Sequence, residues 1–417
     1  MEFRSIGVKV NCRQWLLTGL LALSFSVSLL PAFAQQTPNI TDSVAQQKVN
    51  PLDSVELSLL TCSPHEEIYS LYGHTAIRYH DLRTGEDMAF NWGIFNFKAP
   101  HFALRFVFGL TDYELGLMSF DRFCQYYRKW GSSVTEQVLN LTPDEKRSLI
   151  NAMMVNYQPE NRTYRYNFFF DNCATRPRDM IERNIDGKVM YAAREDYKPT
   201  FREMIRQCTA HHEWATCGND LLLGVRADMK TTREEQEFLP QNLMYDFDHA
   251  QIRATDGSIR PLLKDRRMAV SPGVQMREKD FPLTPTECAC ILLVICLIFA
   301  LMEWRRKKTY KYWDALLITL QGLAGCVLTV MVFSQHPATS LNLQILLLNP
   351  LPLFFLPQVL RRKKTRWWGV LFIMTLLFFV GGFLQHYAEG MYILALSLLL
   401  RVIINVKLQT SKLKVEK

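Results

Sequence analysis

The sequence predicts an α+β exported domain followed by an all-α membrane domain of five transmembrane spans. Up to about residue 281 the chain is polar and mixed, and from Cys288 onward it consists of long apolar stretches broken by short basic clusters. A segment typical of a signal peptide begins the chain. The length of 417 residues is enough for two domains, so the mean hydropathy of −0.04 averages two very different halves.

The apolar half contains five stretches that each come close to the roughly 20 residues needed to cross a bilayer as a helix. These stretches are residues 286–303, 313–333, 341–360, 367–385 and 390–406. Each one is therefore predicted to be a transmembrane helix.

The loops between these stretches alternate between basic loops and loops without basic residues. Residues 305–311 (RRKKTYK), 361–366 (RRKKTR) and the tail from Lys407 are basic, whereas 334–340 and 385–390 contain no lysine or arginine. Because basic loops face the cytoplasm, the C-terminus is predicted to be cytoplasmic and the first domain to lie outside the inner membrane. The same clusters hold much of the net charge of +8, which therefore does not indicate nucleic-acid binding.

The N-terminus has the three parts of a signal peptide. Arg4, Lys9 and Arg13 lie before or at the edge of an apolar core at 15–30, and an Ala-x-Ala pattern offers cleavage after Ala34. The alternative is a retained first transmembrane helix, because the apolar core is just long enough. In both cases the segment that follows is exported.

These features divide the chain into six parts. The parts are a signal peptide (1–34), a Gln-, Ser- and Asn-rich linker (35–54), a periplasmic domain (55–270), a juxtamembrane connector (271–285), the membrane domain (286–406) and a basic cytoplasmic tail (407–417).

Local patterns predict five elements in the exported domain. Residues 54–62 alternate like a strand, and 74–95 read as a β-hairpin around an Arg-Thr-Gly-Glu-Asp turn. Residues 143–158 follow a Thr-Pro-Asp-Glu capping sequence and show helical spacing. The aromatic run 164–170 is predicted to be a strand, and 173–185 a helix that begins at or just after its first residue.

Cys173 and His74 are the candidate chemical groups of this domain. A cysteine at a helix start is exposed to the free N–H groups and positive end of the helix, which lower the thiol pKa and can receive an oxyanion. A thiolate also needs a proton acceptor, and His74 enters a strand directly after a glycine. Each residue alone has an ordinary alternative: Cys173 as a bridged or inert thiol, and His74 as a surface or hydrogen-bonded core residue.

Two segments carry a resemblance to known thiol enzymes. Residues 72–81 (YGHTAIRYHD) and 166–179 (YNFFFDNCATRPRD) resemble circularly permuted NlpC/P60-type and LRAT-like enzymes of the papain-like class. More closely, these segments together with NWGIFNF and FLPQNLM resemble the Lnb-type periplasmic domain, and residues 334–353 resemble the five-span membrane domain that accompanies it. The resemblance implies a papain-like fold, N-acylation of bacterial lipoproteins, Cys173 as the nucleophile and His74 as its base.

The residue that orients the His74 imidazole is open between two candidates. Asn91 lies on the return strand of the hairpin, and Asp171 lies two residues before Cys173. We prefer Asn91, since Asp171 can equally cap a helix or pair with an arginine. Asn172, together with the N–H group of Cys173, is a candidate for the oxyanion hole.

Two arginines and two membrane-domain residues are candidates for substrate binding. Arg176 and Arg178 can hold a lipid phosphate through bidentate contacts, and a structural salt bridge to Asp171 or Asp179 is an equal alternative. His336 and Asn342 lie at the outer ends of predicted spans, where polar residues commonly recognise a ligand or pair helices.

The segment 208–217 combines two cysteines with two histidines. Its spacing fits no zinc pattern, so we predict no metal site and favour a disulfide between Cys208 and Cys217, as expected in an oxidising compartment. Both thiols can also remain unpaired.

The leading functional hypothesis is a membrane-anchored cysteine acyltransferase without a cofactor. It takes an acyl chain from a phospholipid, holds it as a thioester on Cys173, and passes it to the α-amine of a diacylated lipoprotein. One alternative is an NlpC/P60-like peptidoglycan amidase or endopeptidase that uses the same two residues with water. Another is a sensor or assembly protein that keeps the fold without chemistry.

Overall fold

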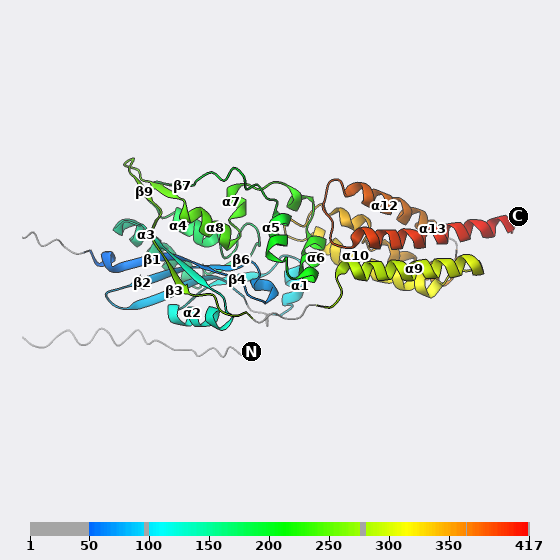
Figure 1. Ribbon diagram of the computed structural model, residues 1–417, viewed down its shortest axis with the longest axis horizontal. Helices are drawn as coiled ribbons and strands as arrows, with labels where there is room; N and C mark the ends of the chain where they lie inside the picture. Colours follow the sequence, from blue (N-terminus) through cyan, green and yellow to red (C-terminus); the bar gives the residue numbers. More distant parts are fainter. Residues whose placement is uncertain (1–49, 96–99, 276–280, 364, 416–417) are drawn as a thin grey trace, which may run out of the picture. The chain divides into compact units, whose positions relative to one another are not determined.

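The computed structural model describes residues 50–95, 100–275, 281–363 and 365–415 (Figure 1). The predicted signal peptide at 1–34 and all but the last few residues of the linker lie outside these ranges, so both stay predictions. The described parts of the exported and membrane domains belong to one compact unit.

An antiparallel sheet of seven strands forms the framework of the exported domain. Its strand order is β10-β5-β1-β2-β3-β4-β6. The strands are β1 (Val55–Cys62), β2 (His74–Asp81), β3 (Glu86–Ile94), β4 (Asp112–Ser119), β5 (Val134–Leu139), β6 (Thr163–Arg165) and β10 (Leu263–Val270). The predicted first strand and the predicted hairpin are therefore confirmed as β1 and as β2 with β3.

Helices cover both faces of this sheet, as Figure 1 shows. Successive residues of a strand face opposite sides, so Leu57 and Leu59 of β1 pack in one core and Leu60 and Cys62 in another. The first core includes side chains from α3 (Pro143–Tyr157), α4 (Thr175–Glu182) and α8 (Pro240–Asp248), and the second includes side chains from α2 (Phe120–Lys129). This two-sided cover explains why β1 is apolar along most of its length.

Helix α3 begins where the sequence predicts. The Thr142 side chain accepts the N–H of Glu145, and the Glu145 carboxylate accepts the N–H of Thr142. These reciprocal bonds satisfy two N–H groups that a helix start otherwise leaves without partners.

The prediction of a strand at 164–170 is wrong beyond Arg165. The Asn167 side chain accepts the N–H of Phe169, and the Asn167 N–H donates to the carbonyl of Asp171. These local bonds close the chain into a turn, because a short polar side chain competes with strand pairing for backbone groups. Phe169 still packs in a buried cluster, so the aromatic run is a core turn.

The remaining elements of the exported domain are short. They are the three-stranded sheet β7 (Lys188–Met190), β8 (Gln251–Arg253) and β9 (Ile259–Pro261), the helices α1 (Phe102–Val107), α5 (Phe201–Cys208), α6 (Glu213–Leu222) and α7 (Arg233–Gln236), and the 3-10 turns η1 (Pro51–Ser54), η2 (Ile68–Ser70) and η3 (Val225–Asp228).

The membrane domain is helical, as predicted. It consists of α9 (Pro285–Arg306), α10 (Lys311–Val332), η4 (Leu343–Leu346), α11 (Leu351–Leu360), α12 (Trp367–Gly381) and α13 (Met391–Val415). Within the described residues, three stretches are long and apolar enough to span a bilayer, namely 285–306, 311–332 and 343–360, and α12 is apolar but shorter.

The third predicted span, 341–360, is not one continuous helix. It is divided into η4 and α11 at residues 347–350, where Asn349 and Pro350 stand in sequence. Proline has no N–H group to donate, and the Asn349 side chain accepts the N–H of Leu351 in place of a helical carbonyl. The break leaves backbone groups of the outer part of this segment available to other partners.

A buried ion triad joins three helices of the membrane domain. The Arg401 guanidinium on α13 bonds Glu303 of α9 at 2.6 and 2.9 Å and Asp314 of α10 at 2.9 and 2.7 Å. All three side chains are almost fully buried. The ends of α9 and α10 that carry these carboxylates flank the basic loop 305–311.

We predict that Arg401→Met destabilises the membrane domain by about 3–5 kcal/mol, because two carboxylates remain buried without their cation. Thermal unfolding of the full chain in detergent micelles measures this. The matched control is the triple variant Glu303→Gln, Asp314→Asn, Arg401→Met, which removes all three charges and is expected to recover most of the loss. Equal unfolding temperatures for the single and triple variants would contradict the prediction.

Candidate active site

The two candidate chemical groups meet at one end of the central strands. His74 is the first residue of β2 and pairs with Cys62, the last residue of β1. Asn91 and Gly93 lie near the end of β3, and Cys173 lies two residues before α4 begins. The antiparallel order of β1, β2 and β3 therefore brings His74 and Asn91 to the edge where the Cys173 turn approaches.

His74 lies between Asn91 and Cys173. Its Nε2 atom is 2.5 Å from Oδ1 of Asn91, and the ring also hydrogen-bonds the thiol of Cys173. Because Nε2 donates to an amide oxygen, the other ring nitrogen, Nδ1, is left to accept the thiol proton. The structure thus brings three predicted residues into one line and places Asn91, not Asp171, against the imidazole.

Gly93 leaves the space in which the cysteine and the histidine meet. Its φ of +95° belongs to the left-handed region, and a Cβ atom built there would lie 3.4 Å from Cβ of Cys173 and 3.7 Å from Cε1 of His74. A side chain at this position would strain the backbone, and its Cβ atom would lie in van der Waals contact with the pair. Sequence reasoning missed this residue, although a glycine at the end of a strand signals a close approach.

The electrostatics favour a thiolate next to an imidazolium. Burial lowers the pKa of His74, but the negative charge and hydrogen bond of Cys173 and the bond to Asn91 more than offset burial, so this pKa is raised. Burial raises the pKa of Cys173, but the charge and hydrogen bond of His74 outweigh it, so the thiol pKa is lowered. The two shifts have one cause, which is the mutual attraction of the pair.

Backbone N–H groups add to this stabilisation. Those of Thr75 and of Cys173 itself hydrogen-bond the sulfur and lower its pKa further. The start of α4 lies two residues beyond Cys173, where the positive end of the helix dipole acts in the same direction. The same N–H groups are placed to receive negative charge that develops beside the sulfur.

The Asn172 side chain hydrogen-bonds the backbone on both sides of Cys173. Its Oδ1 accepts the N–H groups of Ala174 and Thr175, and its Nδ2 donates to the carbonyls of Phe168 and Phe238. The residue is 3% exposed. Since these bonds use the whole amide, the side chain holds the turn in shape and has no donor left for the predicted oxyanion role.

For the two arginines, the structure supports the ion-pair alternative. Arg176 binds both carboxylate oxygens of Asp171 at 2.6 and 2.8 Å and covers the ring of Tyr164. Arg178 is buried against Asp179 and Glu237. Both guanidinium groups thus stabilise the helix that follows Cys173, and neither is brought to the His74 ring.

Four tyrosines that sequence reasoning did not select surround the pair. The ring of Tyr127 stacks on His74 at 6.5 Å between centroids, and Tyr113 stacks on Tyr166 at 4.1 Å. Burial, followed by the charge of Cys173, raises the pKa of Tyr113 to about 12, and burial raises that of Tyr164 well above its ordinary value. These phenols therefore stay protonated at neutral pH. Two of the four, Tyr164 and Tyr166, stand in the Tyr-Arg-Tyr pattern of the aromatic run.

The predicted membrane-domain residues lie elsewhere. His336 belongs to the loop after α10, where its N–H donates to the Ser334 hydroxyl. Asn342 is buried, and its amide donates to the carbonyls of Leu221 and Leu222 in the exported domain. Neither residue is brought next to the His74 ring.

The predicted disulfide between Cys208 and Cys217 is wrong. Both thiols are free, and the sulfur of Cys217 is directed to the carbonyl of Glu389 at 3.8 Å. Cys208 ends α5 and packs against the cluster that contains Phe201, whereas Cys217 lies within α6 and packs against a cluster of the membrane domain, so the two thiols belong to different cores.

The fold and the site together define a membrane-bound protein whose periplasmic sheet domain carries a cysteine, histidine and asparagine cluster. Residues 42–207 match the family model described as the Lnb N-terminal periplasmic domain, and residues 276–413 match the model described as the Lnb transmembrane domain. The chain belongs to the Lnb-type family, in which these two domains occur together. No curated protein and no solved structure was found to match it.

Family membership sets the broad role of the chain. It is an inner-membrane protein with an N-terminal periplasmic domain, and it is an enzyme of lipoprotein maturation.

We predict that Cys173 is alkylated by iodoacetamide at pH values below those at which an ordinary cysteine reacts, because its thiol pKa is lowered. His74→Ala removes the attraction that lowers it, so the midpoint of the pH profile should rise. Peptide mass spectrometry after timed alkylation of the full chain in micelles measures the rate at Cys173 alone. His249→Ala, which removes an exposed histidine, is the matched control. The same midpoint in the His74→Ala variant and the wild type would refute the pairing.

Proposed function

We propose that this protein is a lipoprotein N-acyltransferase that carries the acyl chain as a thioester on Cys173. The observation that supports this most directly is the cluster of three side chains in which His74 lies between Asn91 and Cys173, with Cys173 next to the start of α4. This arrangement supplies a nucleophile, a base and a group that orients the base, which is what acyl transfer through a covalent intermediate requires.

In the first half-reaction, the Cys173 thiolate attacks an ester carbonyl of a phospholipid and forms a carbon–sulfur bond. The carbonyl oxygen becomes an oxyanion, which the N–H groups of Cys173 and Thr75 stabilise. The ester carbon–oxygen bond then breaks. The imidazolium of His74 gives its proton to the departing alkoxide, and a lysophospholipid leaves.

In the second half-reaction, the α-amine of a diacylglyceryl-cysteine at a lipoprotein N-terminus attacks the thioester carbonyl. His74, now neutral, accepts a proton from the amine as the carbon–nitrogen bond forms. The carbon–sulfur bond breaks and returns the Cys173 thiolate beside the imidazolium. No metal or cofactor enters this sequence of steps.

We propose further that all five apolar stretches span the membrane and that the C-terminus is cytoplasmic. The alternation of basic loops with loops that lack lysine and arginine supports this orientation. A membrane-bound enzyme suits the reaction because donor and acceptor both reside in the bilayer.

The orientation predicts that a green fluorescent protein fused after Lys417 fluoresces in cells, since this reporter folds in the cytoplasm and not after export in an unfolded state. A matched fusion that carries the same reporter after Val270, at the end of the periplasmic domain, should be dark. Fluorescence in the second fusion and none in the first would overturn the proposed orientation.

The reaction predicts that cells with Cys173→Ala protein accumulate diacylated lipoproteins, whereas wild-type protein gives N-acylated ones. Mass spectrometry of lipoprotein N-termini measures this. Incubating the purified chain with phospholipid vesicles alone should add one acyl mass to the peptide that contains Cys173.

One control variant and two contrary outcomes separate the alternatives. Cys62→Ala tests another buried cysteine of the same domain and should leave the acyl adduct at Cys173 in place. Cleavage of a peptidoglycan fragment, without acyl transfer, would instead support the amidase. Full N-acylation with Cys173→Ala would contradict any role of this thiol in the chemistry.

A further inference from the structure

The C-terminal end of α6 is capped by side chains of the membrane domain. The last carbonyls of a helix have no partner within it. Here Asn342 donates to Leu221 and Leu222, Gln344 donates to Asp220 and Leu221, and Gln385 donates to Leu223. Gln344 is fully buried, and its Oε1 accepts the N–H of Ala388. The polar residues at the outer ends of the spans thus bind the backbone of the exported domain.

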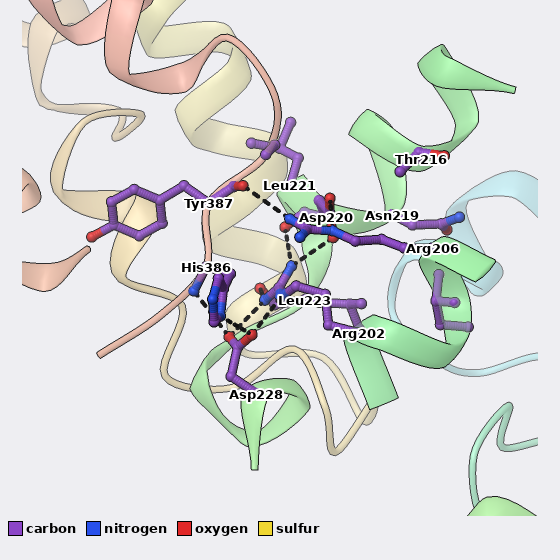
Figure 2. A network of polar contacts seen from close by, with 12 residues as sticks. Arg202, Arg206, Thr216, Asn219, Asp220, Leu221, Leu223, Asp228, His386 and Tyr387 are labelled. Carbon is purple, nitrogen blue, oxygen red and sulfur yellow. Dashed lines mark hydrogen bonds and ion pairs between the residues drawn. The ribbon is translucent and has the colours of Figure 1, made fainter. Parts of the chain in front are cut away.

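A cluster of charges lies beside these caps, as Figure 2 shows. Arg202 is 1% exposed and bonds Asp220 at 3.0 Å and Asp228 at 2.8 Å. From the membrane domain, Nδ1 of His386 lies 3.0 Å from Asp228, and the carbonyl of Tyr387 accepts a bond from Arg206. A buried charge without partners is costly, so these contacts fix one arrangement of the two surfaces.

Backbone contacts complete the junction. The N–H of Gly224 donates to the carbonyl of Ala338 at 2.9 Å, and that of Val225 donates to Leu341 at 3.2 Å. A Cβ atom at Gly224 would lie 2.2 Å from the carbonyl oxygen of Ser340, so only glycine allows this approach. We call the segment 220–228, with its membrane-domain partners at 338–344 and 385–388, the junction.

The junction shares a hydrophobic core with the turn that carries Cys173. Leu223 and Ala227 of the junction and Ala338 of the membrane domain are buried in one cluster with Phe169. Phe238 belongs to the same cluster, and its carbonyl accepts the amide of Asn172. Contacts therefore run from the outer loops of the membrane domain to the residue next to Cys173.

A second set of contacts leads to His74. Nδ2 of Asn219, on α6, donates to the hydroxyl of Tyr72 at 2.8 Å. Tyr72 precedes His74 by two residues and its ring packs edge-on against Phe168. Both members of the pair are thus linked to the capped end of α6.

We propose that the junction is a positioning device for Cys173 and His74. The amides of the membrane domain, Gln344 foremost, hold α6 and the shared core in place. The membrane domain therefore takes part in forming the site as well as anchoring it. This inference rests on the proposed roles of Cys173 and His74, and Gln344 is a positioning residue that touches neither of them.

The test uses the pH profile of Cys173 alkylation in the full chain in micelles. Gln344→Leu nearly keeps the volume of the side chain and removes its hydrogen bonds to Asp220, Leu221, Asn342 and Ala388. We expect the profile midpoint to rise by about half a unit to one unit, which is about a three- to tenfold loss of alkylation rate at pH values below the midpoint. A side chain that only anchored the domain would leave this profile unchanged, because iodoacetamide needs no membrane substrate.

Asn405→Leu is the matched control. It also removes a buried membrane-domain amide, which donates to the carbonyl of Arg401 within α13. Position 405 lies 14 residues beyond the start of α13, about 21 Å along the helix at 1.5 Å per residue. Its profile should match that of the wild type.

Arg206→Gln is a second variant that tests the same role if Gln344→Leu does not fold. This side chain is 39% exposed at the edge of the junction, so its loss is tolerable, and it should shift the midpoint in the same direction by less. Wild-type profiles for folded Gln344→Leu and Arg206→Gln, or an equal shift in Asn405→Leu, would overturn the positioning role. Failure of the wild type to N-acylate a lipopeptide would instead overturn the proposed function, and the alkylation comparison would still stand.

Discussion

The four hydrogen bonds of the Asn172 side chain hold together the turn on which the site depends. One buried amide ties the start of α4 to the aromatic turn before it and to the chain near Phe238, 66 residues further on. Without it, four backbone groups would be buried without partners, which typically costs about 1–3 kcal/mol for each group. The position of Cys173 at the edge of the sheet follows from these bonds.

The charge state of the site follows from the same geometry. An isolated thiolate or imidazolium would be unfavourable in this half-buried position, but the two offset one another, and Asn91 and backbone N–H groups share the stabilisation. The neutral tyrosines around the pair add rings and hydroxyls without adding charge. A charged pair is thus enclosed by neutral aromatic rings, which suits the proposed acyl transfer, in which water must not intercept the acyl group.

The sequence predicted the elements whose signals are local. The hairpin, the capped start of α3 and the helix after Cys173 follow from turn residues, a capping box and helical spacing, and Asn91 follows from its place on the return strand. Prediction from the sequence failed where the partners of a residue are distant along the chain, or where a side chain competes for backbone hydrogen bonds. The strand at 164–170 gave way to the bonds of Asn167, and the third span was divided at Pro350. Asn172 and Asn342 looked like substrate ligands because their partners, Phe238 and the end of α6, lie 66 and about 120 residues away.

The broken third span also bears on how the chain is assembled. The side-chain amides of Asn342 and Gln344 lie at the outer end of this segment, and polar groups there need protein partners in place of lipid. Those partners are carbonyls of a domain that is synthesised and exported earlier. We therefore expect the periplasmic domain to act as an internal template on which the later spans complete their insertion. Biogenesis of the two halves would then be coupled in a fixed order, and the membrane half made alone would lack the surface that finishes it.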